Sequence, residues 1–219
     1  MPTLTPPTSS PEPVAGRMNL YWSPRSPFVR RVMVTLHELG LAMDVHRIDA
    51  VVAMTGCNDG VMRANPLNKI PTLVLADGSV LTDSTLICEH LASDSALAPA
   101  DRTARLQALR WHGIGHGLTD LLVLWRNERL RPAAQQSPEI LAAWDAKSVA
   151  TLAMLDGDAA SLGGTPVTLG HIAIACALGY LDFRFAERNW RTEAPRLAQW
   201  FAAFNQRESM QQTMPPISA

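Results

Sequence analysis

The 219-residue chain has few cysteines, few aromatic residues and no marked excess of charge of either sign. Its three cysteines, Cys57, Cys88 and Cys176, are an odd number without the spacing of metal ligands. This argues against a disulfide framework and against a metal site. Free thiols persist in reducing compartments, so a cytoplasmic location is expected.

Neither a membrane span nor a secretory signal is expected from the sequence. No apolar run is long enough to cross a bilayer, and residues 1–17 are rich in Pro, Ser and Thr. Those residues predict a disordered extension. A formal net charge of -1 gives no electrostatic reason to expect nucleic acid or a membrane surface as a partner. The basic group at Arg25, Arg30 and Arg31 is interpreted as a solvated face or a small-anion site.

Residues 18–93 are predicted to form an α/β domain. Strands are expected at 19–22 and 45–48, and residues 28–39 have the apolar spacing of a helix that ends at Gly40. A loop and a short helix are expected in 49–64. A proline-entered strand, a hairpin turn at 76–79, a second strand and a helix that opens at Asp83 and Ser84 follow.

Beyond a linker at 94–100, residues 101–219 predict an all-helical domain. Helices are expected at 101–129, from Ser137 to about 161, at 172–185 and at 195–206. The segment 172–185 is apolar nearly all round, which indicates the core of this domain. Glycines at 113, 115 and 117 suggest close packing, a kink, room for a ligand or a locally broken helix.

Two motifs resemble the glutathione S-transferase family over nearly the whole chain from residue 18. The first is the turn Ser-Pro-Arg-Ser-Pro-Phe-Val-Arg at 23–30, and the second is the stretch from Asn65 to Leu91. The resemblance implies a thioredoxin-like N-terminal domain and an all-helical C-terminal domain. It also implies glutathione as co-substrate, a homodimer and no metal. Where such transferases place an acidic residue after the helix cap, this chain has His171, so a weakened capping box at Thr168 is expected.

The resemblance implies that Ser26 is the catalytic residue, which stabilises the glutathione thiolate by donating a hydrogen bond. Ser23 is an alternative donor, and a plain helix cap is a third reading of Ser26. A cysteine at this position would have indicated thiol–disulfide exchange, which serine cannot perform.

The same resemblance assigns the rest of the glutathione site. A cis Ile70–Pro71 bond would present the backbone of Ile70 to the cysteinyl part of glutathione. Asp83 and Ser84 would bind the γ-glutamyl end, although a helix cap is the simpler reading of that pair. Lys69 would reach the glycyl carboxylate.

The electrophile is expected to bind against the first long helix of the second domain. Phe28, Trp111, His112 and Gly115 are predicted to line this acceptor pocket, with His116 and Asp120 as further candidates on the same helix. The expected reaction is attack of the glutathione thiolate on a small hydrophobic electrophile, as in detoxification. Alternatives are a glutathione-dependent isomerase, dehalogenase or ether-cleaving enzyme, or a non-catalytic binding protein that retains the fold.

Overall fold

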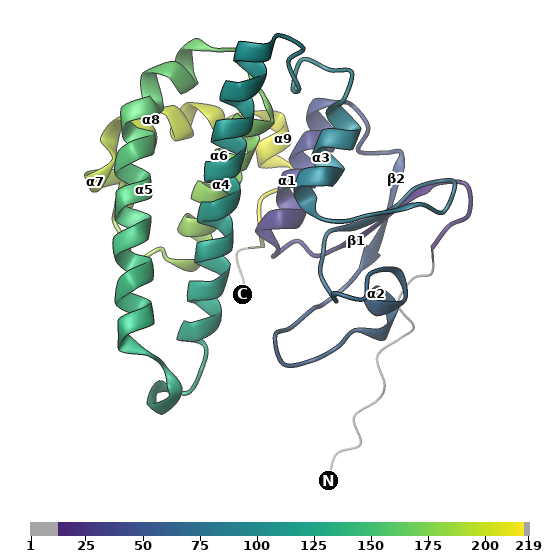
Figure 1. Cartoon of the computed structure of the whole chain (residues 1–219), viewed down its shortest axis with the longest axis horizontal. Coiled ribbons are helices and arrows are strands. Elements are labelled where there is room, and N and C mark those ends of the chain that lie inside the picture. Colours follow the sequence, from purple (N-terminus) through teal and green to yellow (C-terminus); the bar gives the residue numbers. More distant parts are fainter. Residues whose placement is uncertain (1–12, 217–219) are drawn as a thin grey trace.

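The computed structural model describes residues 13–216. Most of the predicted N-terminal extension, residues 1–12, lies outside the described residues, so that expectation stays a prediction. Figure 1 shows a sheet-containing part beside a bundle of long helices, with α1 and α3 between the sheet and the bundle.

Four strands form one mixed sheet in the order β2-β1-β3-β4. They are β1 (Met18–Trp22), β2 (Val45–Asp49), β3 (Thr72–Val74) and β4 (Val80–Leu81). β1 runs parallel to β2 and antiparallel to β3, and β3 runs antiparallel to β4. Parallel neighbours need a crossover, which helix α1 (Pro27–Glu38) supplies. The predicted hairpin joins β3 and β4, with Gly78 at φ 87°.

Two further helices complete this thioredoxin-like part. The expected short helix is α2 (Asp59–Ala64), and α3 (Ser84–Ala92) begins where the sequence predicted. Helices α1 and α3 pack against each other, and α1 also packs on α6 of the helical part. The side of α1 that contains Arg30 and Arg31 is therefore buried, and the prediction of a solvated basic face is wrong for these two arginines.

The rest of the described chain is helical. Its long helices are α4 (Arg102–Arg129), α5 (Pro138–Gly164), α6 (Leu169–Arg184) and α8 (Pro195–Phe204). Short helices η1 (Ala133–Gln135), α7 (Trp190–Glu193) and α9 (Glu208–Gln211) connect or follow them. Every residue of α6 from Leu169 to Leu181 is buried, which confirms the prediction that this helix forms the core.

The N-terminus of α6 corrects one expectation. The backbone N–H of Thr168 donates to Nδ1 of His171 at 3.0 Å, so the histidine takes the place of the acidic residue in the capping box. The capping box is therefore intact and not weakened. Burial lowers the pKa of His171 to about 4, which keeps Nδ1 available as an acceptor.

Among residues 13–216, none of the helices is both long enough and apolar enough to span a membrane.

Candidate active site at one edge of the sheet

The sheet topology brings three separate sequence motifs to one edge. Tyr21 of β1 lies opposite Thr72 of β3, so the turn after β1 adjoins the Ile70–Pro71 segment that precedes β3. Leu73 lies opposite Leu81 of β4, so the residues after β4 reach the same edge. The turn with Ser26, the backbone at Ile70 and the start of α3 therefore meet, although about 60 residues separate the first from the last.

Ser26 is the N-cap of α1. Its Oγ accepts a hydrogen bond from the backbone N–H of Val29 at 3.3 Å, and its own N–H donates to the Ser23 carbonyl at 3.2 Å. A hydroxyl that accepts in this way keeps its proton free to donate to a ligand. Ser26 is half-buried at the positive end of the helix, where a negative charge is stabilised.

The segment before β3 is held by side chains. The carbonyl of Lys69 accepts hydrogen bonds from Thr72 Oγ1 at 2.8 Å and from Asn65 Nδ2 at 3.2 Å. The Ile70–Pro71 peptide bond is cis, as the family resemblance implied. The N–H and C=O of Ile70 make no hydrogen bond within the described part of the chain, so both can pair with an extended ligand. The Lys69 side chain is exposed.

The start of α3 contains a cap and an unsatisfied hydroxyl. Asp83 is the N-cap, and its Oδ1 accepts from the N–H groups of Thr85 at 2.6 Å and Leu86 at 3.3 Å. Burial opposes ionisation of Asp83, but these hydrogen bonds prevail and lower the pKa of its carboxyl. Ser84 is only 1% exposed, and its Oγ has no hydrogen-bond partner among the described residues. A buried hydroxyl without a partner is uncommon in folded proteins, so Ser84 Oγ calls for an explanation.

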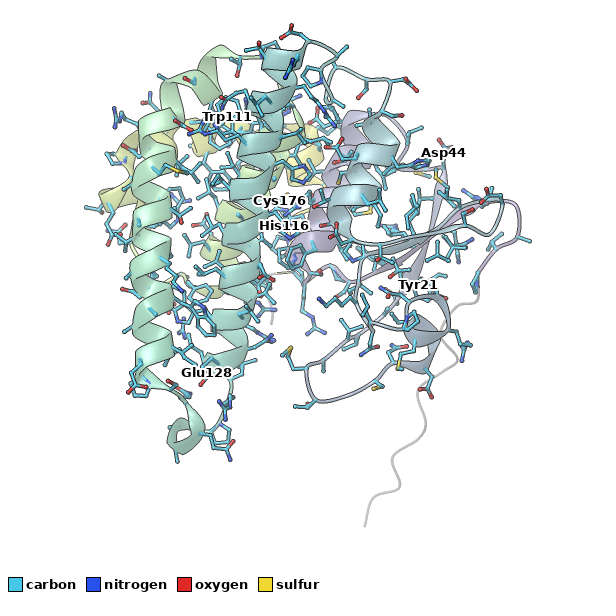
Figure 2. All side chains as sticks on the ribbon, in the orientation of Figure 1. Tyr21, Asp44, Trp111, His116, Glu128 and Cys176 are labelled. Carbon is cyan, nitrogen blue, oxygen red and sulfur yellow. The ribbon has the colours of Figure 1, made fainter. Side chains whose placement is uncertain are left out.

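Two histidines of α4 make polar contacts with residues of α1 and α3. The ring of His116 lies 5.5 Å from the ring of Phe28, centroid to centroid, and its Nδ1 is 3.2 Å from Thr85 Oγ1. Behind it, Nη1 of the fully buried Arg31 is 3.1 Å from His116 Nδ1 and 3.2 Å from His112 Nε2. Figure 2 shows His116 on the side of α4 that faces the sheet-containing part.

Three of the four residues predicted to line the acceptor pocket are placed elsewhere. Trp111 is 2% exposed, and its Nε1 donates to Asp158 of α5 at 3.0 Å. Gly115 lies against the backbone of α6, and His112 is 2% exposed behind Arg31. The predictions for Trp111 and Gly115 are wrong because these residues pack α4 on its neighbouring helices. His112 contributes only indirectly, and Phe28 alone keeps a place near the site.

A shallow hollow, with room for about one water molecule, adjoins Ser26. The turn at 24–27 and the α6 residues Gly179, Tyr180 and Phe183 are part of its lining. Residues of α6 thus lie next to the turn that contains Ser26, which sequence reasoning missed. Within residues 13–216, no group of three or more histidine, cysteine or acidic side chains could hold a metal ion.

This arrangement defines a two-domain fold in which a thioredoxin-like sheet edge faces an all-helical domain. Residues 25–94 match the N-terminal domain of glutathione S-transferases, and residues 138–203 match the C-terminal domain of that family. The GST-like protein YibF of Escherichia coli K12, described as uncharacterised, is 33% identical over 91% of this chain and 99% of its own. The chain belongs to the glutathione S-transferase family.

Solved structures extend this likeness. A glutathione transferase family member from Pseudomonas fluorescens Pf-5, solved with bound glutathione, is 36% identical and has a TM-score of 0.87, covering 91% of this chain and 99% of its own. A second structure from the same organism contains S-(propanoic acid)-glutathione, with a TM-score of 0.83, 36% identity and coverage of 91% and 100%.

Proposed function

We propose that the protein is a glutathione S-transferase that adds the glutathione thiolate to a small hydrophobic electrophile. The observation that supports this best is the buried, unpartnered Oγ of Ser84 at the start of α3. It lies at the same sheet edge as the cap of α1 and the unpaired backbone of Ile70. An extended tripeptide with a carboxylate at one end, an amide in the middle and a thiol beyond it fits these three positions.

Each contact has a defined role in this proposal. The γ-glutamyl carboxylate accepts from Ser84 Oγ and from the N–H groups at the start of α3, and Asp83 faces the ammonium group. The N–H and C=O of Ile70, set by Pro71, pair with the cysteinyl residue. Lys69 is exposed at the end of this segment and neutralises the glycyl carboxylate.

Ser26 stabilises the thiolate without forming a covalent bond. A free thiol with a pKa near 8.5 needs about 2.7 kcal/mol to lower that value by two units. A hydroxyl hydrogen bond to a charged acceptor supplies about 1.5–3 kcal/mol, and the helix N-terminus adds about 0.3–1 kcal/mol. Together, the hydrogen bond and the helix N-terminus are enough to lower the thiol pKa by about two units. The Pseudomonas relative, solved with glutathione and with a glutathione thioether, supports both the ligand and the type of product.

The protein is further proposed to act as a homodimer through α3 and α4. Leu86 of α3 and Leu106 and Leu109 of α4 are exposed, Leu106 to 69%. An ion pair between Glu89 and Arg105 links these two helices. A second copy of the chain would cover this apolar face.

Calorimetric titration with reduced glutathione tests the binding site. The wild-type protein is expected to bind one equivalent per chain, and Ser84→Ala is expected to bind about 10- to 100-fold more weakly, since one hydrogen bond to a carboxylate is lost. Because Ser84 Oγ has no protein partner, the variant should unfold at nearly the wild-type temperature. Equal affinity of both proteins, or no binding at millimolar glutathione, would overturn the assignment.

A further inference from the structure

The contacts of His116 fix which of its ring nitrogens carries the proton. A guanidinium group only donates hydrogen bonds, so Nδ1 of His116, 3.1 Å from Arg31 Nη1, must be the acceptor. The hydroxyl of Thr85, 3.2 Å from the same nitrogen, must then donate as well. A neutral imidazole has one protonated nitrogen, so the proton of His116 is on Nε2.

The second imidazole on Arg31 follows the same rule. His112 Nε2 lies 3.2 Å from Arg31 Nη1 and must accept, which puts the proton of His112 on Nδ1, where it faces Glu89 Oε1 at 3.7 Å. The two N–H bonds of one guanidinium nitrogen thus serve two histidines. Arg31 fixes both rings, but only His116 is open to the site, because His112 is 2% exposed.

The Nε2–H of His116 is left without a protein partner. No described residue hydrogen bonds to it, and it is not among the buried atoms that lack a partner. Its ring packs on Phe28, two residues after Ser26, and its Nδ1 contacts Thr85, which follows Ser84. The donor therefore stands on α4, beside the first turn of α1 and the start of α3.

The charged groups around His116 favour the neutral ring. Burial and the guanidinium of Arg31 lower the pKa of His116, while the carboxylates of Asp83 and Asp120 oppose this effect. Protonation of Nδ1 would direct an N–H bond at Arg31, so the cation is disfavoured by geometry as well. The ring remains a donor with a fixed direction at neutral pH.

We propose that His116 is the specificity-determining hydrogen-bond donor of the acceptor site and that it selects electrophiles with a carbonyl or nitro oxygen conjugated to the attacked carbon. The assignment rests on the proposed transferase function. When the thiolate sulfur bonds to the β-carbon of an enone, the π electrons move to the carbonyl oxygen. His116 Nε2–H then stabilises that oxygen. The thiol proton leaves to water, and water returns a proton to the α-carbon, so the enone and glutathione give one saturated thioether.

Kinetics with two probe electrophiles test this role. 4-Phenylbut-3-en-2-one develops charge on oxygen, and benzyl bromide, which loses bromide from a saturated carbon, does not. His116→Phe keeps an aromatic ring against Phe28 but lacks the donor, and is expected to lower kcat/KM for the enone by about 10- to 100-fold. The value for benzyl bromide should change less than threefold. His116→Gln, which keeps an N–H near the position of Nε2, should recover most of the enone activity.

His112→Gln is the matched control, since it alters the other partner of Arg31 one helical turn away and cannot reach a ligand. An equal loss of enone selectivity in this variant would overturn a direct role for His116. So would a parallel fall for both electrophiles in His116→Phe, or a loss confined to glutathione affinity. Absence of turnover with both probes in the wild-type protein would contradict the transferase function instead.

Nitrogen-15 NMR of the wild-type protein tests the same assignment without turnover. The His116 ring should appear as the neutral Nε2–H tautomer at pH 7, and its Nε2 resonance should shift when S-(3-oxo-1-phenylbutyl)glutathione, the enone product, is added. A Nδ1–H tautomer, an imidazolium ring, or product binding that leaves Nε2 unchanged would contradict it. This readout also holds if a substituted variant fails to fold.

Discussion

Gly115 of α4 lies directly on the backbone of Ala173 in α6: a Cβ at position 115 would stand 2.5 Å from the Ala173 carbonyl carbon. Atoms cannot approach this closely, so the glycine is what allows the two helices to pack. Gly170 makes the reciprocal approach, with the carbonyl oxygen of Ala108 2.6 Å from a Cβ built there. The two glycines together fix the crossing of α4 and α6.

Gly115→Ala should therefore destabilise the protein, although alanine is the better helix former. Overpacking at a rigid backbone contact costs about 1–3 kcal/mol in the free energy of unfolding. Gly113 is the matched control, because it lies in the same helix with no atom within 4 Å of a Cβ. Gly113→Ala should stabilise by about 0.5–1 kcal/mol. Urea unfolding measures both, and a stabilised Gly115→Ala protein would contradict the close approach.

The buried histidines make stability depend on pH. Burial, assisted by Arg31, lowers the pKa of His112 from 6.5 to about 4. As the pH falls, the unfolded chain takes up this proton before the folded protein does, so stability is lost between pH 6.5 and about 4 and is complete above that range. From pH 7.5 to pH 5, this group alone accounts for about 2 kcal/mol of lost stability.

The variant His112→Gln isolates this contribution, because glutamine accepts a hydrogen bond from Arg31 but does not titrate. The free energy of unfolding in urea should fall less steeply with pH in the variant than in the wild-type protein. Identical slopes for the two proteins between pH 7.5 and pH 5 would show that His112 titrates normally in the folded state.

The proposed dimer interface is tested at Leu106. A glutamate there would introduce charge into an apolar contact, so Leu106→Glu should be monomeric at concentrations where the wild-type protein is a dimer. Met43 is 85% exposed outside α3 and α4, so Met43→Glu serves as the control and should remain dimeric. Light scattering after size-exclusion chromatography distinguishes the species. A wild-type monomer, or a dimeric Leu106→Glu protein, contradicts the interface.

Short-range patterns were enough to predict most of the fold. The apolar spacing in α1, the hairpin at Gly78 and the all-round hydrophobicity of α6 are local signals, and each element formed where they indicated. That Ser26, Ile70 and Ser84 lie at the same edge of the sheet could be predicted only from the family resemblance. Local sequence patterns do not show which strands are neighbours in a sheet.

The acceptor side could not be predicted in the same way. Three glycines interrupt the apolar periodicity of α4, so the sequence does not show which face of the helix is buried. Trp111 and Gly115 were therefore assigned to the wrong face. From the sequence alone, Arg31 is expected to be a solvated surface charge. In the structure it is buried against two histidines that lie 81 and 85 positions further along the chain. One signal was present: Phe28 and Arg31 are one helical turn apart, as are His112 and His116, so each pair shares a helix face.

The role of Ser26 is tested most directly by the ionisation of glutathione bound to the protein, followed by the ultraviolet absorbance of the thiolate as a function of pH. Ser137→Ala is the matched control for Ser26→Ala, because Ser137 caps α5 with the same 3.3 Å contact, to the N–H of Ile140, and also precedes a proline. Each variant should lose about 1 kcal/mol of stability with its cap.

Only Ser26→Ala should raise the pKa of the bound thiol, by about one to two units, while glutathione affinity stays within a few-fold of the wild-type value. A thiol titration curve in Ser26→Ala that matches the wild-type and Ser137→Ala curves would contradict the central claim and leave Ser26 as a helix cap alone.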